Sequence, residues 1–260
     1  MTNDNWQKQT KDQPLHPDLI WSRPTNMQTA GKLLIIGGNA NGFKDPAATY
    51  AQAKAAGVGQ IKVLIPDSLK KIIGRQIEEA EFAPSNKSGS FAKQSLATFL
   101  DLAAWADGTI LAGDLSSNSE TIAMLENFAD MYKGILCFSQ DAMDLAVNNP
   151  HIIISRPNSL IALDFDKLQK LLVNSHFPRA LKSTMSIDNY GEVLIEYSKR
   201  YQPIIVSQFN DNIVVVGNGK ITTTRTTDKI DISHLAVKST IWWLQNPNKP
   251  IPAISSAVIN

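Results

Sequence analysis

The strongest constraint on the fold of this chain is a series of short segments that are apolar at nearly every position. Residues 33–36 read Leu-Leu-Ile-Ile, and residues 213–216 read Ile-Val-Val-Val. Strands that are apolar on successive residues are covered on both faces, as in a parallel sheet between two layers of helices. Helical patterns separate most of these segments, and this alternation predicts a doubly wound sheet. The expected strands are residues 32–38, 60–66, 108–114, 134–139, 151–155 and 203–208.

The segment at residues 212–226 has a different pattern. Two β-prone runs flank Asn218-Gly219, a dipeptide that strongly favours a two-residue hairpin. We therefore expect a three-layer α/β/α fold with a mainly parallel, doubly wound sheet and an antiparallel ribbon near its C-terminal part. Residues 1–30 lack a clear period and are expected to form an irregular arm, packed by Trp21 or reaching a neighbouring subunit. Residues 31–260 are expected to form a single domain.

Two helices carry recognisable end signals. Residues 45–57 form a helical pattern, with Asp45 as the expected N-cap and Gly57 as the stop. A second helix is expected over residues 67–80, with Asp67 as its cap. Both aspartates are therefore predicted to stabilise helix starts.

Composition excludes several classes of function. The formal net charge is +1, so no global field attracts nucleic acid or an anionic membrane. No apolar run approaches the roughly 20 residues that span a bilayer, and residues 1–30 lack the apolar core of a secretory signal. The single cysteine, Cys137, lies in an apolar strand pattern and is expected to be a buried structural thiol. These features predict a cytoplasmic protein with no nucleic-acid or membrane partner.

Open parallel sheets bind ligands at the carboxyl ends of their strands, so functional residues are expected in the loops after the strands. Gly37 and Gly38 end the first strand, but their spacing fits neither the dinucleotide fingerprint nor a P-loop. The glycine pair can form a phosphate cradle, a substrate seat or only a tight turn. Asp114 follows the third strand, where it could bind a ribose or a metal, or cap the next helix.

Two further loops contain polar residues. Ser139 or Gln140 is expected at the mouth of the site, with Asp141 as a helix cap. Arg156 follows the expected strand at residues 151–155, where it could pair with a phosphate or form a surface ion pair. The four histidines share no metal-ligand spacing and no Cys/His cluster exists, so no protein metal site is expected. A G-x-S-x-G nucleophile motif is absent.

The order of these loops resembles a known family. Residues 31–66 are similar to the opening of the ADP-dependent NAD(P)H-hydrate dehydratases, members of the ribokinase-like superfamily, in which a Gly-Gly-Ser turn leads to an aromatic residue, a small-residue helix and a strand ending in Pro. Gly37, Gly38, Asn39, Phe43 and Pro66 occupy those places. Weaker similarities follow in the same order over residues 107–121, 134–146, 151–163 and 203–226.

The resemblance implies a reaction and its ligands. The family removes water from hydrated NADH or NADPH by ADP- or ATP-dependent phosphorylation, and Mg²⁺ is a candidate cofactor. An aspartate at a glycine-rich helix start acts as base, while the helix amides hold the phosphoryl group. The residues that the resemblance places in this chain are Asp231 as the catalytic base, Gly37, Gly38, Asn39, Gly113, Asp114 and Arg156 on the substrate side, and Gln208, Asn210, Thr227 and Ser233 on the nucleotide side.

Several family motifs are altered in this chain. The glycine-rich turn before the catalytic aspartate is replaced by residues 226–231, Thr-Thr-Asp-Lys-Ile-Asp. Loss of one such amide donor costs on the order of 10²–10³ in rate, so weakened or lost catalysis is expected. The alternatives are a non-catalytic interaction or assembly protein and a divergent small-molecule kinase. The resemblance also implies a homo-oligomer, with the arm at residues 1–30 and the Ile-Trp-Trp-Leu segment at 241–244 as contacts; core packing is the other interpretation of its tryptophans.

Overall fold

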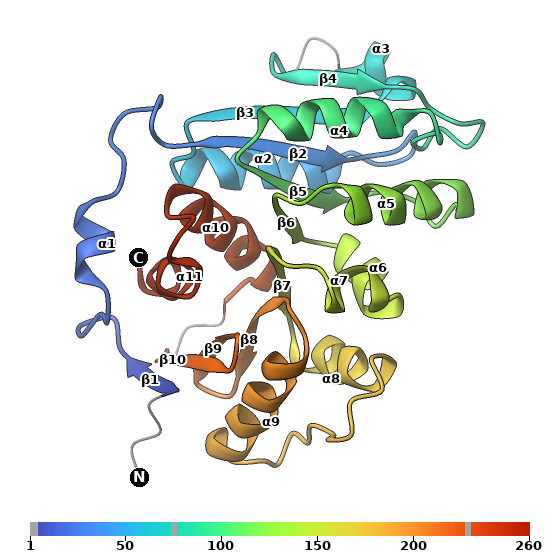
Figure 1. The fold of residues 1–260 in the computed structure, drawn as a ribbon. Coiled ribbons are helices and arrows are strands. Elements are labelled where there is room, and N and C mark those ends of the chain that lie inside the picture. Colours follow the sequence, from blue (N-terminus) through green and yellow to red (C-terminus); the bar gives the residue numbers. More distant parts are fainter. Residues whose placement is uncertain (1–4, 74–76, 227–229) are drawn as a thin grey trace.

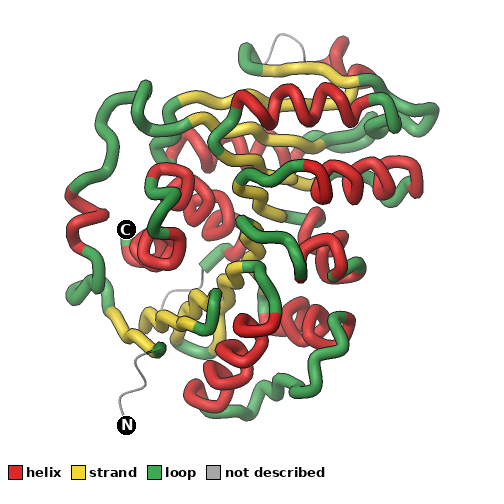
Figure 2. The backbone as a smooth tube through the Cα atoms, in the orientation of Figure 1, coloured by secondary structure: helices red, strands yellow, loops and turns green. Residues whose placement is uncertain are grey.

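The computed structural model describes residues 5–73, 77–226 and 230–260, and its centre is a ten-stranded sheet (Figures 1 and 2). The strand order is β1-β10-β9-β8-β7-β6-β5-β2-β3-β4, and only β9 runs against its neighbours. The strands are β1 Trp6–Gln9, β2 Lys32–Gly37, β3 Gln60–Pro66, β4 Ala80–Ala83, β5 Gly108–Gly113, β6 Ile135–Phe138, β7 Ser159–Leu163, β8 Ile204–Phe209, β9 Asn212–Gly217 and β10 Lys220–Arg225.

Helices cover both faces of the sheet, which gives three layers (Figure 1). One face packs against α4 Ser95–Trp105, α5 Ser119–Met131, α6 Ala142–Asn148, α7 His151–Ile154, α8 Phe165–Asn174 and α9 Ile187–Arg200. The other packs against α2 Lys44–Ala55, the 3₁₀ turn η1 Asp67–Leu69, α3 Lys70–Ile73, α10 Ile232–Gln245 and α11 Pro250–Ile259. A short helix, α1 Pro17–Trp21, lies against α11.

The two layers explain the apolar strands. In β2, Leu34 and Ile36 join the core under α4 and α5, whereas Leu33 and Ile35 join the core under α2 and α10. Successive side chains point to opposite faces, so both faces require apolar residues. The predicted three-layer fold with a mainly parallel sheet is confirmed. The hairpin is confirmed too, because Asn218 and Gly219 have φ values of 52° and 73° and connect antiparallel β9 and β10.

The strand expected at residues 151–155 is wrong. These residues form α7, and the next strand, β7, begins at Ser159. A run of three isoleucines fits a buried helical turn as well as a strand, and Pro150 at the N-cap position favours the helix start. The loop after this strand therefore begins beyond Leu163.

The helix expected over residues 67–80 is wrong in its second half. The described helix α3 is Lys70–Ile73, residues 74–76 of the expected helix lie outside the described residues, and β4 forms at the sheet edge by pairing with β3. The Asp67 carboxylate does not cap its helix; it accepts hydrogen bonds from the amide and hydroxyl of Ser85, 3.0 and 2.5 Å away. The pairing of β4 with β3 depends on tertiary structure, so the helical periodicity of the sequence could not predict it.

The described part of the arm, residues 5–30, contains regular structure that was not expected. Its strand β1 pairs in parallel with β10, and Trp6 donates a hydrogen bond to the Thr223 hydroxyl over 3.1 Å. Trp21 does not pack the arm, because it is 87% exposed; Leu19 is buried instead against Trp242. The arm therefore extends the sheet.

The Ile-Trp-Trp-Leu segment at residues 241–244 is buried within the chain, so its expected use as an intersubunit contact is wrong and the core interpretation is confirmed. Cys137 is also buried, as expected, and burial raises the pKa of its thiol to about 12. This thiol is therefore protonated at neutral pH. Among the described residues, no helix combines the length and apolar character needed to cross a membrane.

Candidate functional site

The segments at the carboxyl ends of the neighbouring strands β2 and β5 pack closely against each other. The Gly38 amide donates to the Gly113 carbonyl over 3.0 Å, and the Asn39 side-chain amide donates to the Asp114 carbonyl over 2.6 Å. The structure thus brings together five of the residues assigned to the substrate side: Gly37, Gly38, Asn39, Gly113 and Asp114. Adjacent parallel strands place their following loops at one edge of the sheet, as the sequence predicts.

The glycines here permit two chain segments to approach each other. A Cβ at Gly37 would lie 2.5 Å from the Gly113 carbonyl oxygen. Gly113 has a φ of 106°, and its Cβ would lie 2.6 Å from Asp45 Oδ2 and 2.7 Å from Asp141 Oδ1. Glycine is required at both positions because even a methyl group would collide with neighbouring atoms. Gly113 in particular allows two carboxylates to lie directly over the strand end.

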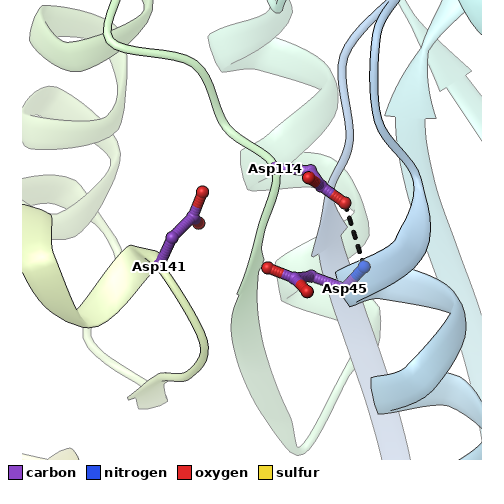
Figure 3. A group of neighbouring side chains, drawn as sticks. All are labelled: Asp45, Asp114 and Asp141. Atoms are coloured by element: carbon purple, nitrogen blue, oxygen red, sulfur yellow. Dashed lines mark hydrogen bonds between the residues drawn. The ribbon is translucent and has the colours of Figure 1, made fainter.

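Three carboxylates gather at this point (Figure 3). Ligand oxygens of Asp45, Asp114 and Asp141 all lie within 4.8 Å of one another. Asp114 Oδ2 accepts the Asp45 amide over 2.9 Å. The aspartates come from the first turn of α2, the loop after β5 and the start of α6, so the sheet brings together residues nearly one hundred positions apart.

Sequence reasoning missed two of these carboxylates because it assigned them to helix caps. Phe43, not Asp45, is the N-cap residue of α2. Asp141 does occupy the N-cap position of α6, but its side chain makes no capping hydrogen bond. Asp114 does not cap α5, since Asn118 does so by accepting the Glu120 amide. The available signal was that all three aspartates closely follow ends of neighbouring strands.

The cluster alters proton affinity. The Asp141 residue is exposed as a whole, but partial desolvation of its carboxyl and then the charges of Asp45 and Asp114 raise its pKa to about 6, although a hydrogen bond from the Asp114 amide acts in the opposite direction. Burial and the charge of Asp114 also raise the pKa of Asp45. Within the part of the chain that the structure describes, no basic side chain forms an ion pair with these three aspartates. The site is therefore strongly acidic at neutral pH.

This clustering predicts a pH-dependent cost in stability. Folded Asp141 binds its proton more tightly than the unfolded chain, where the pKa is near 3.8, so its contribution to the free energy of unfolding falls as pH rises from about 4 to about 6. Asp141→Asn should melt near the wild-type temperature at the low end of this window and above it beyond the high end. Melting curves across this range check the difference; Asp144→Asn, whose carboxylate pairs with Lys167, is the control. A constant difference for Asp141→Asn would contradict the expectation.

The carboxylate cluster also fits a hard divalent cation. Mg²⁺ and Ca²⁺ prefer oxygen ligands, and Mg²⁺ in particular is often held by one or two carboxylates together with substrate phosphates and water. Asp45, Asp114 and Asp141 offer three oxygens around one point. A bound cation would offset the mutual repulsion of the three negative charges.

The described nucleotide-side residues lie at the end of β8 and at the start of α10. Asp231 is the N-cap of α10, and its Oδ1 accepts the amides of Ser233 and His234 over 2.9 and 3.4 Å. Gln208 lies near the end of β8, and Asn210 follows with a φ of 50°. Thr227 lies outside the described residues. Asp231 and Ser233 are thus adjacent at one helix start.

The placement predicted for Arg156 is wrong. It follows from the misassigned strand at residues 151–155, and the structure puts this arginine at the amino ends of β6 and β7, the opposite edge of the sheet. The side chain is buried and donates to five main-chain carbonyls and one hydroxyl: those of Ala129, Tyr132, Gly134, Pro157, Asn158 and Ser159. Its guanidinium therefore connects the segment at residues 129–134 to residues 157–159 by hydrogen bonds.

No protein-family model and no curated protein matches this sequence. Solved structures do match. A ribokinase-like superfamily protein of Enterococcus faecalis has a TM-score of 0.69 and 15% identity, over 100% of this chain and 87% of that one. The ADP/ATP-dependent NAD(P)H-hydrate dehydratase of Bacillus subtilis, co-crystallised with ATP/Mg²⁺, has a TM-score of 0.53 and 13% identity, over 90% of this chain and 79% of its own.

A third match extends the comparison to a different activity. Phosphomethylpyrimidine kinase of Clostridium difficile has a TM-score of 0.53 and 13% identity, over 87% of this chain and 96% of that one. At such low identities the likeness concerns the backbone, and proteins of one fold carry different functions. What the matches share with this chain is the overall path of the backbone. The chain therefore has the three-layer α/β/α fold of the ribokinase-like superfamily.

Proposed function

We propose that this protein is an NAD(P)H-hydrate dehydratase-like nucleotide-binding protein in which phosphoryl transfer is weakened or lost. Two features support nucleotide binding: the fold is shared with a dehydratase co-crystallised with ATP/Mg²⁺, and the carboxyl edge contains an acidic group suited to Mg²⁺. Under this proposal ADP or ATP lies over the ends of β8 and β10, and the second ligand lies toward Gly38 and Asp114.

The observation that carries the proposal is that a carboxylate already occupies the free amides at the start of α10. A helix start binds phosphate through its free amides and the positive end of its dipole. In this chain the Asp231 carboxylate accepts the amides of Ser233 and His234. A fixed negative charge therefore occupies the place where the transferred phosphoryl group would need donors, and this opposes catalysis.

Asp231→Asn tests this assignment. Asparagine caps a helix about as well as aspartate, so the fold should be retained while the charge is removed. We expect ADP and ATP with Mg²⁺ to raise the melting temperature of the wild type and to raise that of Asp231→Asn further. Hydrated NADH with ADP or ATP should give little recovery of dihydronicotinamide absorbance with the wild type.

The opposite result would identify Asp231 as a catalytic base. Full turnover by the wild type, with a loss of about 10²-fold or more in Asp231→Asn, contradicts an obstructed site. Asp188→Asn is the matched control, because this aspartate is also near a helix start but lies on α9, where its only described ion pair is the 4.0 Å contact with Lys8. Absence of any nucleotide effect on melting would favour an interaction or assembly protein.

The acidic cluster favours a small-molecule kinase as the second candidate function. Three carboxylates repel an anionic dinucleotide unless a cation is bound, whereas a neutral or cationic substrate is not repelled. Phosphate transfer from ATP to such a substrate, with no effect of hydrated NADH, would support this candidate over the dehydratase-like one.

A further inference from the structure

A cavity of about 390 Å³ lies between the paired strands β1 and β10 and the start of α11. Its volume is in the range of small-molecule sites. Lys220, the first residue of β10, lines the cavity, and β10 runs in the same direction as the parallel strands of the sheet. The cavity is therefore at the amino edge of the sheet, opposite the carboxyl edge to which the proposed function assigns the nucleotide.

Three successive threonines of β10 differ in their hydrogen-bond partners. The Thr223 hydroxyl accepts a hydrogen bond from Trp6 over 3.1 Å, and the Thr224 hydroxyl accepts one from Gln9 over 2.9 Å. Thr222 lines the cavity and is only 1% exposed, but its hydroxyl makes no hydrogen bond with any described residue. A buried hydroxyl without a partner is costly, so a polar group inside the cavity is expected to bond to it.

Strand alternation directs the Thr222 side chain toward α11. Ile221 packs into the core on the side of α4 to α9, so the side chains of Lys220 and Thr222 point to the other side. Gln7 is paired with Thr222 in the β1–β10 ladder and lies on the same side. Gln9, two residues further along β1, donates to a main-chain carbonyl of α11 over 2.8 Å, which identifies this side as the α11 side.

The ionised side chains of the cavity wall are both basic. They are Lys220, which forms no ion pair with a described residue, and Lys249, whose partner Asp18 lies 3.6 Å away in an exposed pair. Exposed pairs of this kind are weak. Burial lowers the pKa of His16, so this third basic residue is mainly neutral at neutral pH. The wall therefore attracts an anion with two lysine charges.

The remainder of the wall combines hydrogen-bond donors with a small apolar surface. The apolar part is formed by Pro250, Ile251 and Pro252. The two prolines have no amide hydrogen, so the start of α11 offers few main-chain donors and side chains must supply them. The amide side chains of the wall are those of Asn5, Gln7, Asn218 and Asn248.

We infer that the cavity binds a small organic phosphate, a phosphomonoester with a compact apolar body. The two ammonium groups match a doubly charged phosphate, and its oxygens accept hydrogen bonds from the lysines and from the Thr222 hydroxyl. The apolar body packs against Ile251 and its flanking prolines. An organic cation is repelled by the lysines. This inference goes beyond the proposed function and does not rest on it, because it concerns the opposite edge of the sheet.

Calorimetric titration of the full chain at low ionic strength tests this inference. Phenyl phosphate and phenol share a ring but differ in charge, so we expect phenyl phosphate to bind at least about 10-fold more tightly. Inorganic phosphate, which lacks the ring, should bind more weakly than phenyl phosphate. Lys220→Met should lower phenyl phosphate affinity by about 10-fold or more and leave phenol affinity unchanged.

The role of the hydroxyl is tested by a pair of variants. Thr222→Val keeps the shape of the side chain but removes the hydroxyl, and should lower phenyl phosphate affinity by about 10-fold or more. Thr222→Ser keeps the hydroxyl and should retain most of the affinity. Melting curves confirm folding before titration. Lys170→Met, which removes an exposed lysine of α8, is the control for loss of one positive charge.

Four results would overturn the inference. They are equal affinities for phenyl phosphate and phenol, equal affinities for phenyl phosphate and inorganic phosphate, equal losses in Thr222→Val and Thr222→Ser, and equal losses in Lys220→Met and Lys170→Met. Saturating ADP with Mg²⁺ should not displace phenyl phosphate, because the nucleotide is assigned to the other edge of the sheet. Displacement would contradict a separate phosphate site.

Discussion

Replacement of Arg156 by methionine is expected to lower the free energy of unfolding by about 3–5 kcal/mol, because it leaves five buried or partly buried carbonyls without their donor. Methionine is similar in length, so the cavity term is small and the lost hydrogen bonds dominate. Although burial lowers the pKa of this guanidinium to about 10, it remains charged at neutral pH. Denaturant unfolding of both proteins measures the difference.

Arg179→Met is the matched control for this experiment. Arg179 forms an exposed ion pair with Glu196 over 2.9 Å, and such pairs contribute about 0–1 kcal/mol. Equal losses for the two variants would contradict the structural role assigned to Arg156. So would a destabilisation of Arg156→Met below about 1 kcal/mol, the size expected of a surface arginine.

Gly113→Ala is expected to lower the free energy of unfolding by about 3 kcal/mol and to disrupt the acidic cluster. Alanine at a φ of 106° is strained, at a cost of about 1–3 kcal/mol. The new methyl group would also lie 2.6 and 2.7 Å from oxygens of Asp45 and Asp141 and 3.0 Å from the Gln140 Cβ, so these side chains must move apart. Affinity for Mg²⁺, measured by titration, should fall together with stability.

Gly108→Ala is the control, because Gly108 lies in the same strand. Its nearest neighbours to an added Cβ are at 3.5 Å or more, and its φ is not in the left-handed region. This variant should unfold within about 1 kcal/mol of the wild type and retain Mg²⁺ affinity. Similar losses in the two variants would show that the crowding at Gly113 is not the cause.

The three layers of this fold can be predicted from the sequence because a strand buried on both faces needs apolar residues at consecutive positions. Strand β2 is apolar at the consecutive positions 33–36, and each of these four side chains packs into one of the two cores. The hairpin at Asn218 is encoded just as locally, through residues that accept positive φ. Strands that depend on a partner elsewhere in the chain have no such local pattern: β4 forms by pairing with β3, and β1 by pairing with β10.

The site was predictable only in part for the same reason. Gly37 and Gly113 end β2 and β5, and Asp114 follows β5, so their convergence could be expected from the sheet. Asp45 lies in the first turn of α2 and Asp141 directly precedes α6; an aspartate at a helix start usually caps the helix, so the local rule gave the wrong role. Asp45 and Asp141 instead lie beside Asp114 and against Gly113, which has no side chain to keep them apart. This arrangement exists only in the folded protein, so the sequence does not reveal it.

The pairing of β1 with β10 has a kinetic consequence. Trp6 and Thr223 are 217 positions apart, so closure of this pair must await synthesis of most of the chain and carries the largest loop entropy in the sheet. Until then one border of β10 presents unsatisfied peptide groups that another chain can capture. Renaturation from denaturant should consequently give a lower yield of folded protein at higher protein concentration, because chains in which β1 is still unpaired can associate through β10.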